Sequence, residues 1–344
     1  MSFIGPKTPE LTAEMFEELK TTNADWVGLI PEATLDRATL TFQSELRDHV
    51  WWGGTIAANV ESIQLAKQAG FKVFLKPHIV LGKIPTYDDI ESVLQRVGPK
   101  TFRHGREDLT DGVEWRGELH PKRPVDLLIW ESSYEQYILQ LAQIAQDWEV
   151  DLFAIGTELK KSAWKRPEFW RQLIQKVRAI YQGPITYAAN WDEYQKITFW
   201  DELDYIGVDT YFPVSRKATP DLKSTLKNWR PIKKQLKKFS KSVDRPILLT
   251  EFGYRNVNYA GKRPWTHDKV PAVVNNQAQA NLYAAFFQTF WEEPWVVGGF
   301  AWKWFAEPKR QGNTSFSVRG KPALKMVQEW YGKEKHPDNI YAKF

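Results

Sequence analysis

The stretch FAIGTELKK, residues 153–161, is an apolar run that ends on a carboxylate at Glu158. Its first residues have the composition of a buried strand, and its glycine leaves room for a close neighbour. The stretch RPILLTEFGY, residues 245–254, repeats this design and ends its apolar run on Glu251. Because an unpartnered buried carboxylate is costly, each of these acids is predicted to have either a structural ion-pair partner or a function.

Around these two stretches, short apolar runs alternate with longer segments of helical period along the whole chain. The expected strands are 1–5, 25–31, 71–79, 150–158, 183–190, 203–212, 245–251 and 296–305, and the expected helices are 11–22, 55–70, 132–148, 167–181, 221–240, 275–293 and 321–331. Buried strands separated by helices predict an α/β fold with a parallel sheet covered on both faces. Eight strands favour closure into a (β/α)8 TIM barrel. An open doubly wound sheet is the alternative, but its glycine-rich fingerprint is absent after the first strand.

No linker rich in proline, glycine or serine divides the chain, so we expect a single catalytic domain over residues 1–344. One segment interrupts the alternation, because residues 80–130 separate the third expected strand from its helix. A loop of this length in a compact domain is usually either a functional lid or a disordered insertion. In a barrel it would follow a strand and lie on the catalytic face, so it is predicted to form a wall of the site.

Aromatic residues are abundant, with 17 Trp, 13 Tyr and 19 Phe making up 14% of the chain. Tryptophan suits surfaces that stack against rings, although core packing must account for many of these side chains. The formal charge of +5 is small beside 47 basic and 42 acidic residues. The densest basic run, residues 227–241, has the pattern of the solvated face of an amphipathic helix that begins near Pro231. No nucleic-acid-binding motif accompanies it, so no nucleic-acid partner is expected.

The sequence contains no cysteine, which excludes disulfides and thiolate chemistry. No window of eighteen apolar residues occurs, so no membrane span is expected. We expect a monomer that is secreted, periplasmic or at the cell surface, with an export signal outside this sequence, and the cytoplasm is the alternative. The six histidines show no metal-binding spacing, so neither a metal nor a cofactor is expected. A serine hydrolase is disfavoured because no G-x-S-x-G motif is present.

In a barrel, the C-terminal ends of the strands form the floor of the active site. Glu158 ends the fourth expected strand and Glu251 ends the seventh. Two carboxylates that face a cleft lined by tryptophan meet the requirement for glycoside hydrolysis, in which one acid protonates the leaving oxygen and the other attacks or activates water. Structural ion pairs with lysine or arginine are the alternative for both acids.

This layout of two glutamates resembles the large clan of retaining glycosidases with (β/α)8 barrels. Four segments resemble glycoside hydrolase family 113, the β-mannanase family, and they are IGTEL around Glu158, LTEFGY around Glu251, GGFAWKWF (298–305) and GNTSFSVRGKPAL (312–324). The resemblance runs over essentially the whole chain. It implies a retaining enzyme for β-mannosidic linkages, in β-1,4-mannan or manno-oligosaccharides, with Glu158 as acid/base and Glu251 as nucleophile.

The resemblance also suggests roles for three further residues. Tyr211, in DTYFP, matches a clan tyrosine that hydrogen-bonds the nucleophile, and Trp302 matches the tryptophan on the floor of the sugar subsite beside the scissile bond. Many clan members place asparagine immediately before the acid/base, where it holds the 2-hydroxyl of the sugar. Thr157 stands there in this chain, so the partner of that hydroxyl is left open.

Several other residues near predicted strand ends are candidate contacts for the sugar or the acids. Lys76 has the same parity as His78 and is predicted to hold a carboxylate inside the barrel. Asp209 precedes Tyr211 by two residues and is either a partner of the site residues or a structural acid. Trp304 has the same parity as Trp302 and is either its neighbour in the site or a core residue. The remaining candidates are His78, Asn190, Trp191 and the adjacent pair Trp51 and Trp52, of which one is expected to pack inward.

The chemistry predicts a raised pKa for Glu158, because the negative charge of Glu251 lies nearby. Two alternatives to the mannan assignment remain open. The same chemistry could act on another β-linked glycan, such as a glucan or xylan. A non-catalytic carbohydrate-binding barrel would keep the aromatic residues and use both acids structurally.

Overall fold

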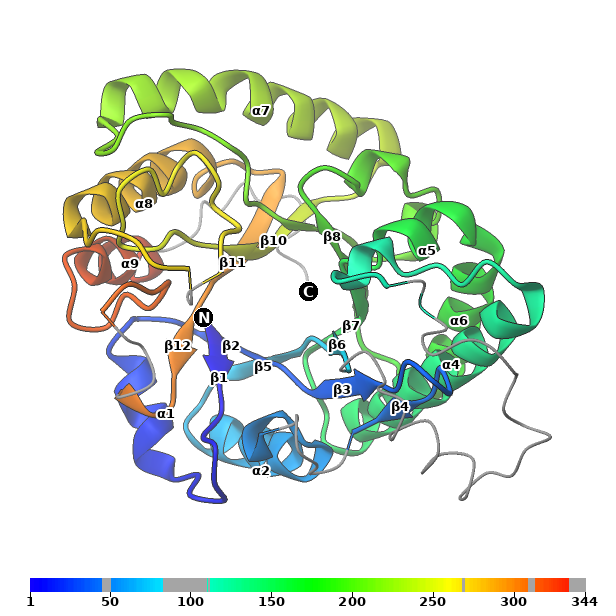
Figure 1. Ribbon diagram of the computed structural model, residues 1–344. Coiled ribbons are helices and arrows are strands. Elements are labelled where there is room, and N and C mark those ends of the chain that lie inside the picture. Colours follow the sequence, from blue (N-terminus) through cyan, green and yellow to red (C-terminus); the bar gives the residue numbers. More distant parts are fainter. Residues whose placement is uncertain (45–50, 83–109, 111, 268–269, 309–312, 334–344) are drawn as a thin grey trace.

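The barrel strands follow one another in chain order around a parallel sheet (Figure 1). The computed structural model describes residues 1–44, 51–82, 110, 112–267, 270–308 and 313–333. Among these residues the main sheet has the order β11-β10-β9-β8-β7-β5-β2-β1-β12. Only two residues separate β11 from β12, which pairs with β1, so the last two strands are halves of one strand that closes the ring. The predicted (β/α)8 barrel is confirmed.

The barrel strands are β1 (Ser2–Ile4), β2 (Trp26–Leu29), β5 (Lys72–Leu75), β7 (Leu152–Thr157), β8 (Ile185–Asn190), β9 (Tyr205–Asp209), β10 (Ile247–Phe252), β11 (Val296–Ala301) and β12 (Trp304–Phe305). The helices are α1 (Ala13–Lys20), α2 (Ile56–Gln68), α4 (Pro124–Asp147), α5 (Lys160–Lys165), α6 (Pro167–Ile180), α7 (Leu222–Val243), α8 (Asn276–Phe290) and α9 (Ala323–Tyr331). Short 3-10 turns are η1 (Trp52–Gly54), η2 (Arg116–Glu118), η3 (Tyr194–Lys196) and η4 (Trp200–Glu202). The helices surround the sheet (Figure 1).

Helix α6 shows how a helix packs against the barrel, with the Trp170 ring in contact with Tyr187 of β8 at a centroid distance of 5.1 Å. In α6 the buried residues are Phe169, Trp170, Leu173, Ile174 and Val177, which share one face at helical spacing. The glycine of FAIGTELKK allows this close packing, because a Cβ at Gly156 would lie 2.7 Å from the Tyr134 hydroxyl and 2.9 Å from the Trp170 ring.

A separate small core cluster consists of Phe74, Leu152, Ala154, Leu248 and Phe300, one or two residues from each of four barrel strands. A second cluster contains Ile4, Ile30 and Phe305, which lie nearer the C-terminal ends of their strands. Such layers of side chains fill the interior of a closed barrel. The polar site is therefore built on an apolar floor.

Two barrel strands continue beyond the rim into a small second sheet. The order of this sheet is β4 (Phe42–Gln43), β3 (Glu32–Leu35) and β6 (His78–Leu81). Its strands β3 and β6 are parallel and pair Glu32 with His78. The extensions of β2 and β5 thus place these two polar residues next to each other above the C-terminal end of the barrel.

Two local expectations are corrected. The helix expected at 132–148 begins earlier, at Pro124, where a proline is compatible with the first helical turn. Pro231 lies inside α7 rather than at its start, because Asp221 caps the helix by accepting the backbone N–H of Ser224 at 2.8 Å. Of the long 80–130 segment, residues 83–109 and 111 lie outside the described part of the chain.

In the part of the chain that the structure describes, no helix combines the length and the apolar character that crossing a bilayer requires.

Candidate active site

Glu251 lies in β10 between a cation and a phenol. The ammonium of Lys76, which directly follows β5, contacts Glu251 Oε1, and both side chains are buried. The Tyr211 hydroxyl donates to Glu251 Oε2 at 2.7 Å. Burial alone opposes ionisation, but the charge of Lys76 is the largest effect in favour of the carboxylate, and the pKa of Glu251 lies well below its usual range. Glu251 is therefore a carboxylate at neutral pH.

Asp209 lies beside this pair and shares its cation. Its Oδ1 is 3.9 Å from the Lys76 ammonium and accepts a hydrogen bond from the Thr250 hydroxyl at 2.7 Å. Burial, and then the charge of Glu251, raise the pKa of Asp209 well above its usual range. Lys76 therefore lies within reach of both Glu251 and Asp209. The opposite pKa shifts indicate that Glu251 is ionised and that Asp209 favours the protonated form.

Glu158 lies immediately beyond β7 in a backbone conformation that is uncommon for a residue with a side chain. Its φ is +54°, in the left-handed region. Two hydrogen bonds hold this turn, because the Glu158 N–H donates to the Ala188 carbonyl at 2.8 Å and the Leu159 N–H donates to the Tyr187 hydroxyl at 2.7 Å. The turn takes the carboxyl away from the regular alternation of the strand.

A buried acid supports the same turn from β8. Glu193 Oε1 accepts hydrogen bonds from the Tyr187 hydroxyl at 3.2 Å and from the Asn190 N–H at 3.0 Å. Burial raises the pKa of Glu193 to about 8. We did not single out Glu193 or Tyr187 from the sequence, because neither residue belongs to a recognisable motif.

Burial raises the pKa of Glu158, as the sequence analysis predicted, although the nearby Arg116 opposes this effect and Glu251 adds to it. Arg116 Nη2 donates to Glu158 Oε2 at 2.9 Å. The two acids therefore have opposite pKa shifts, with the Glu158 carboxyl favouring a proton and Glu251 favouring the charged form. This separation is the arrangement that acid–base chemistry at a single bond requires.

Arg116 comes from η2, in the long connection between β6 and α4. The length of this connection predicts a wall of the site, but no motif in it marks a particular residue. The described part of the connection does supply a side chain to Glu158. An arginine in a polar stretch has no local signal that distinguishes it from its charged neighbours.

His78 and Trp302 form a stacked pair beside Glu251. Their ring centroids are 5.7 Å apart with an interplanar angle of 14°, and the Lys76 ammonium lies 5.4 Å from the Trp302 ring. Burial, and then the charge of Arg116, lower the pKa of His78 to about 3, so the imidazole is neutral. Its Nε2 lies 3.4 Å from Glu251 Oε1 and makes no hydrogen bond within the described residues.

The glycine of LTEFGY has a structural role at this site. A Cβ at Gly253 would lie 2.4 Å from the Trp302 carbonyl oxygen. The Trp302 N–H donates to the Phe252 carbonyl at 2.7 Å, which joins the end of β10 to the break between β11 and β12. This close approach sets where the Trp302 ring lies.

A second aromatic group lies at the rim beyond β8. Trp191 stacks on Trp265 with a centroid distance of 5.5 Å and an angle of 21°, and it contacts Phe212 on another side at 5.5 Å. Trp265 is 46% exposed, so its outer face is open to a ligand. Asn190 Oδ1 accepts the Trp191 N–H at 2.8 Å, which leaves the Asn190 side-chain NH2 without a partner within the described residues.

The other candidate sugar contacts have different surroundings. The Thr157 hydroxyl donates to the Pro77 carbonyl at 2.9 Å, so its proton is not free for a sugar. Trp51 packs with Trp302 on one apolar cluster, and Trp52 packs on the main core. Trp304 is only 1% exposed and its ring is covered by the Arg319 guanidinium at 4.2 Å, so it lies in the core, which is one of the two alternatives that its sequence position allowed.

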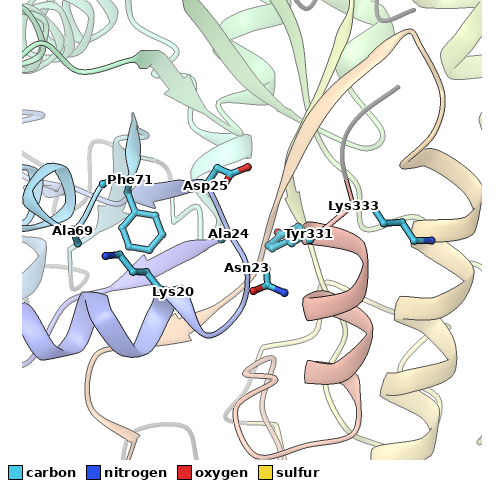
Figure 2. A pocket seen from close by; sticks show the side chains of 10 residues that line it. Lys20, Asn23, Ala24, Asp25, Ala69, Phe71, Tyr331 and Lys333 are labelled. Atoms are coloured by element: carbon cyan, nitrogen blue, oxygen red, sulfur yellow. The ribbon is translucent and has the colours of Figure 1, made fainter. Parts of the chain in front are cut away.

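A cavity of about 620 Å³ lies at the opposite end of the barrel. Figure 2 shows its lining, which comes from the end of α1, from Asp25 before β2, from Phe71 before β5 and from the end of α9. Because these residues precede their strands, the cavity is remote from the acids at the C-terminal strand ends. The described residues contain no cluster of three or more histidine or acidic side chains able to hold a metal ion.

The family model of glycoside hydrolase family 113 matches residues 110–321, which is more than half of the chain. The chain belongs to glycoside hydrolase family 113. It is therefore a glycoside hydrolase, and its substrate is a glycan. The matched region includes both strand-end glutamates and Arg116. No curated protein matches the chain.

Solved structures with the same fold include two members of this family. The GH113 β-mannanase from Alicyclobacillus acidocaldarius, in complex with ManMIm, is 23% identical and gives a TM-score of 0.75 with 96% of each chain covered. A second GH113 β-1,4-mannanase complex is 23% identical, with a TM-score of 0.72 and 97% and 98% coverage. A β-glucuronidase from Faecalibacterium prausnitzii is 13% identical, with a TM-score of 0.59, and 48% of that chain is covered against 96% of this one. These similarities show the barrel fold.

Proposed function

We propose that this family 113 enzyme is a single-domain retaining hydrolase of β-mannosidic linkages, with Glu251 as nucleophile and Glu158 as acid/base. The observation that carries the proposal is the opposite electrostatic environment of the two acids. Lys76 and Tyr211 stabilise the charged form of Glu251, whereas burial favours the protonated form of Glu158. A nucleophile and a general acid need these two states at the same pH.

In the first half-reaction, a carboxylate oxygen of Glu251 forms a bond to the anomeric carbon and the glycosidic C–O bond breaks. Glu158 donates its proton to the leaving oxygen. Burial, and then the Glu251 charge, raise the pKa of Tyr211, so its phenol keeps the proton that it donates to Glu251. This hydrogen bond fixes one carboxylate oxygen and leaves the carboxylate plane oriented for attack.

In the second half-reaction, the ionised Glu158 takes a proton from water. The water oxygen attacks the anomeric carbon, and the bond to Glu251 breaks with its electron pair returning to the carboxylate. Two inversions at the anomeric carbon give net retention. His78, neutral and with an unpartnered Nε2, is suited to hold a sugar hydroxyl beside the reacting carbon throughout.

The aromatic side chains support a carbohydrate with several subsites. Trp302 offers a ring for the sugar whose anomeric carbon reacts with Glu251, since it stacks on His78 and lies next to Lys76. Trp191 follows β8 and Trp265 comes from the connection between β10 and α8, so this stacked pair suits a further sugar subsite at the rim. The mannan assignment is supported by family membership and by two similar structures that are mannanases by name.

The test is product release from mannan, glucomannan, manno-oligosaccharides, cellulosic and mixed-linkage glucans, and xylan. Wild type is compared with Glu158→Ala, Glu251→Ala and the control Glu61→Ala, an exposed acid on α2. We expect cleavage of the mannan substrates that is lost only in the first two variants. Cleavage of a glucan or xylan instead would refute the mannan assignment, and undiminished activity in either acid variant would refute the assigned roles.

A further inference from the structure

Arg116 is the basic side chain in direct contact with Glu158 within the described residues. Its Nη2 lies 2.9 Å from Glu158 Oε2, and the two side chains are 19% and 14% exposed. The buried Arg116 Nε makes no hydrogen bond within the described residues. Arginine often binds a carboxylate through two parallel hydrogen bonds, and here only one is made. The guanidinium is therefore close enough to act on the Glu158 charge without being locked to it.

The segment that carries Arg116 is held firmly in place. Lys161 of α5 pairs with Glu118 at 2.8 Å, and the neighbouring Leu119 is 1% exposed. A Cβ at Gly117 would lie 2.3 Å from the Trp115 ring, so the backbone of η2 packs directly beneath that indole. Of these contacts the burial of Leu119 contributes most, because an exposed ion pair adds little. Together they place η2 beside α5, the helix that follows β7.

The charge on Arg116 is sustained by the acids of the site. Burial opposes the charge, but the neighbouring Glu158 and then Glu251 outweigh this effect and raise the pKa of Arg116. The guanidinium is therefore a fixed positive charge at a carboxyl that must exchange a proton twice in each catalytic cycle.

The groups that face Glu158 come from five other parts of the barrel. They are Arg116 of η2, Lys76 after β5, Glu193 after β8, Asp209 of β9 with Tyr211 after it, and Glu251 of β10. Among them only Arg116 and Lys76 are cations, and Lys76 contacts Glu251 instead. The positive charge that bears most directly on Glu158 is therefore Arg116.

We propose that Arg116 is a positioning residue that orients the Glu158 carboxyl and stabilises its ionised form, the general base of the second half-reaction. This inference rests on the proposed function, because it concerns the acid/base of that reaction. Burial favours the protonated form of Glu158, which the first half-reaction needs as its general acid. The same burial disfavours the carboxylate form, which the second half-reaction needs as its general base. The guanidinium offsets this cost at the moment when Glu158 must accept a proton from water.

The proposal predicts a shift in the pH profile. Glu158 must be protonated in the free enzyme, so activity is lost on the alkaline side as pH rises through its pKa. Removing the Arg116 charge raises that pKa and moves the alkaline limb of kcat/KM to higher pH, by about 1–3 units for a neighbouring arginine. The second half-reaction slows, because a carboxyl with a higher pKa is less available as a carboxylate.

The experiment compares Arg116→Met, Arg116→Gln and Arg116→Lys with wild type on the glycan that the substrate panel identifies and on the corresponding 2,4-dinitrophenyl β-glycoside. The dinitrophenolate leaves without a proton. For that substrate, kcat/KM should therefore show no alkaline limb that depends on Glu158, in the wild type or in any variant. Arg116→Gln keeps a donor and loses the charge, whereas Arg116→Lys keeps the charge. The control Lys161→Met removes a cation of the same region that pairs with Glu118 at the surface and does not contact Glu158. Because an exposed ion pair contributes little, the buried Leu119 still holds η2 in this variant.

On the natural glycan, we expect the alkaline limb of kcat/KM to move up by about one pH unit or more in Arg116→Met and Arg116→Gln. It should stay near its wild-type position in Arg116→Lys and Lys161→Met. Accumulation of the glycosyl-enzyme, seen as a burst of dinitrophenolate, should increase in Arg116→Met. An unmoved limb in both uncharged variants of an active enzyme overturns the proposal, as does an equal shift in Lys161→Met. If the wild type cleaves neither a glycan of the panel nor a dinitrophenyl β-glycoside, the proposed function and this inference are overturned together, whereas an active enzyme with unmoved limbs overturns this inference alone.

Discussion

Lys76 offers a sharp test of how the site holds its nucleophile. Lys76→Met keeps much of the length and apolar stem of the side chain but removes the ammonium that contacts Glu251. Because the two side chains are 0% and 6% exposed, solvent screens this charge pair little. At an effective dielectric constant of about 20 and a separation of about 4 Å, a charge pair is worth roughly 4 kcal/mol. Since one pKa unit corresponds to about 1.4 kcal/mol, loss of the Lys76 charge should raise the pKa of Glu251 by at most roughly 3 units.

The sign of the effect follows from the state that reacts. Glu251 attacks as a carboxylate, so activity is lost on the acid side as pH falls through its pKa. Lys76 lowers that pKa, and its removal therefore moves the acid limb of kcat/KM to higher pH, by about 1–3 units. The stabilisation that the lowered pKa provides is present above the unfolded pKa of a glutamate and lost as pH falls, so the variant should also unfold more readily at neutral pH.

The assay is the pH dependence of kcat/KM for Lys76→Met beside Lys72→Met. Lys72 is an exposed residue at the start of the same strand, and its ammonium lies 5.5 Å from the Trp26 ring. Thermal unfolding of both variants, followed by circular dichroism, shows whether the barrel is intact. An acid limb that stays in place in a folded Lys76→Met enzyme would refute the reasoning. A matching shift in Lys72→Met would show that the effect is not local.

The remaining predictions concern individual contacts. Tyr211→Phe removes a hydrogen bond to a charged group and should lower kcat/KM by roughly 10–100-fold with the fold intact, as steady-state kinetics would show. Trp265→Ala should raise KM for long manno-oligosaccharides by about 2–10-fold, because a sugar ring loses its stacking partner. Trp164 is similarly exposed, and Trp164→Ala should leave KM unchanged. Equal effects of the two substitutions would refute a sugar subsite at Trp265. Gly156→Ala should lower the stability by about 1–3 kcal/mol in chemical unfolding, because its methyl would overlap the Tyr134 hydroxyl.

The positions of the two acids were accessible from the sequence because barrel topology brings strand ends together. Glu158 and Glu251 each terminate an apolar run, and eight such runs predict a closed sheet whose C-terminal ends converge. Lys76 was also predicted to hold a carboxylate inside the barrel, from its parity with His78. The structure has Lys76 in contact with Glu251. The inferences about the two acids need only the order of the strands, and the inference about Lys76 also needs the alternation of side chains along a strand.

Parity along a strand failed where the strands are irregular. Leu248 is in the apolar cluster with Phe300, and Glu251 would face the other side of a regular strand, but the register of β10 shifts between Leu248 and Glu251. An irregularity of this kind redirects the side chains that follow it. The break between β11 and β12 acts in the same way, since Trp302 is in the site while Trp304, of the same parity, is in the core.

Residues that reach the site from connections could not be predicted. Arg116 lies 38 residues beyond His78 in sequence, and its contact with Glu158 depends on the path of a connection without strand or helix periodicity. Glu193 is linked to the Glu158 turn through the Tyr187 hydroxyl, which donates to Glu193 and accepts the Leu159 N–H. Such contacts depend on three-dimensional placement, which local sequence patterns do not contain.

The central claim about this enzyme is that Glu251 forms a covalent bond to the sugar. The direct measurement is mass spectrometry of peptides after incubation with a 2-deoxy-2-fluoro-β-mannosyl fluoride, in which the fluorine at C2 slows the second half-reaction and lets the glycosyl-enzyme accumulate. The account predicts one mannosyl adduct on the peptide that contains Glu251, and no adduct in Glu251→Ala. An adduct on Glu158, or turnover on natural substrate that gives the inverted anomer by NMR with no adduct anywhere, would contradict it.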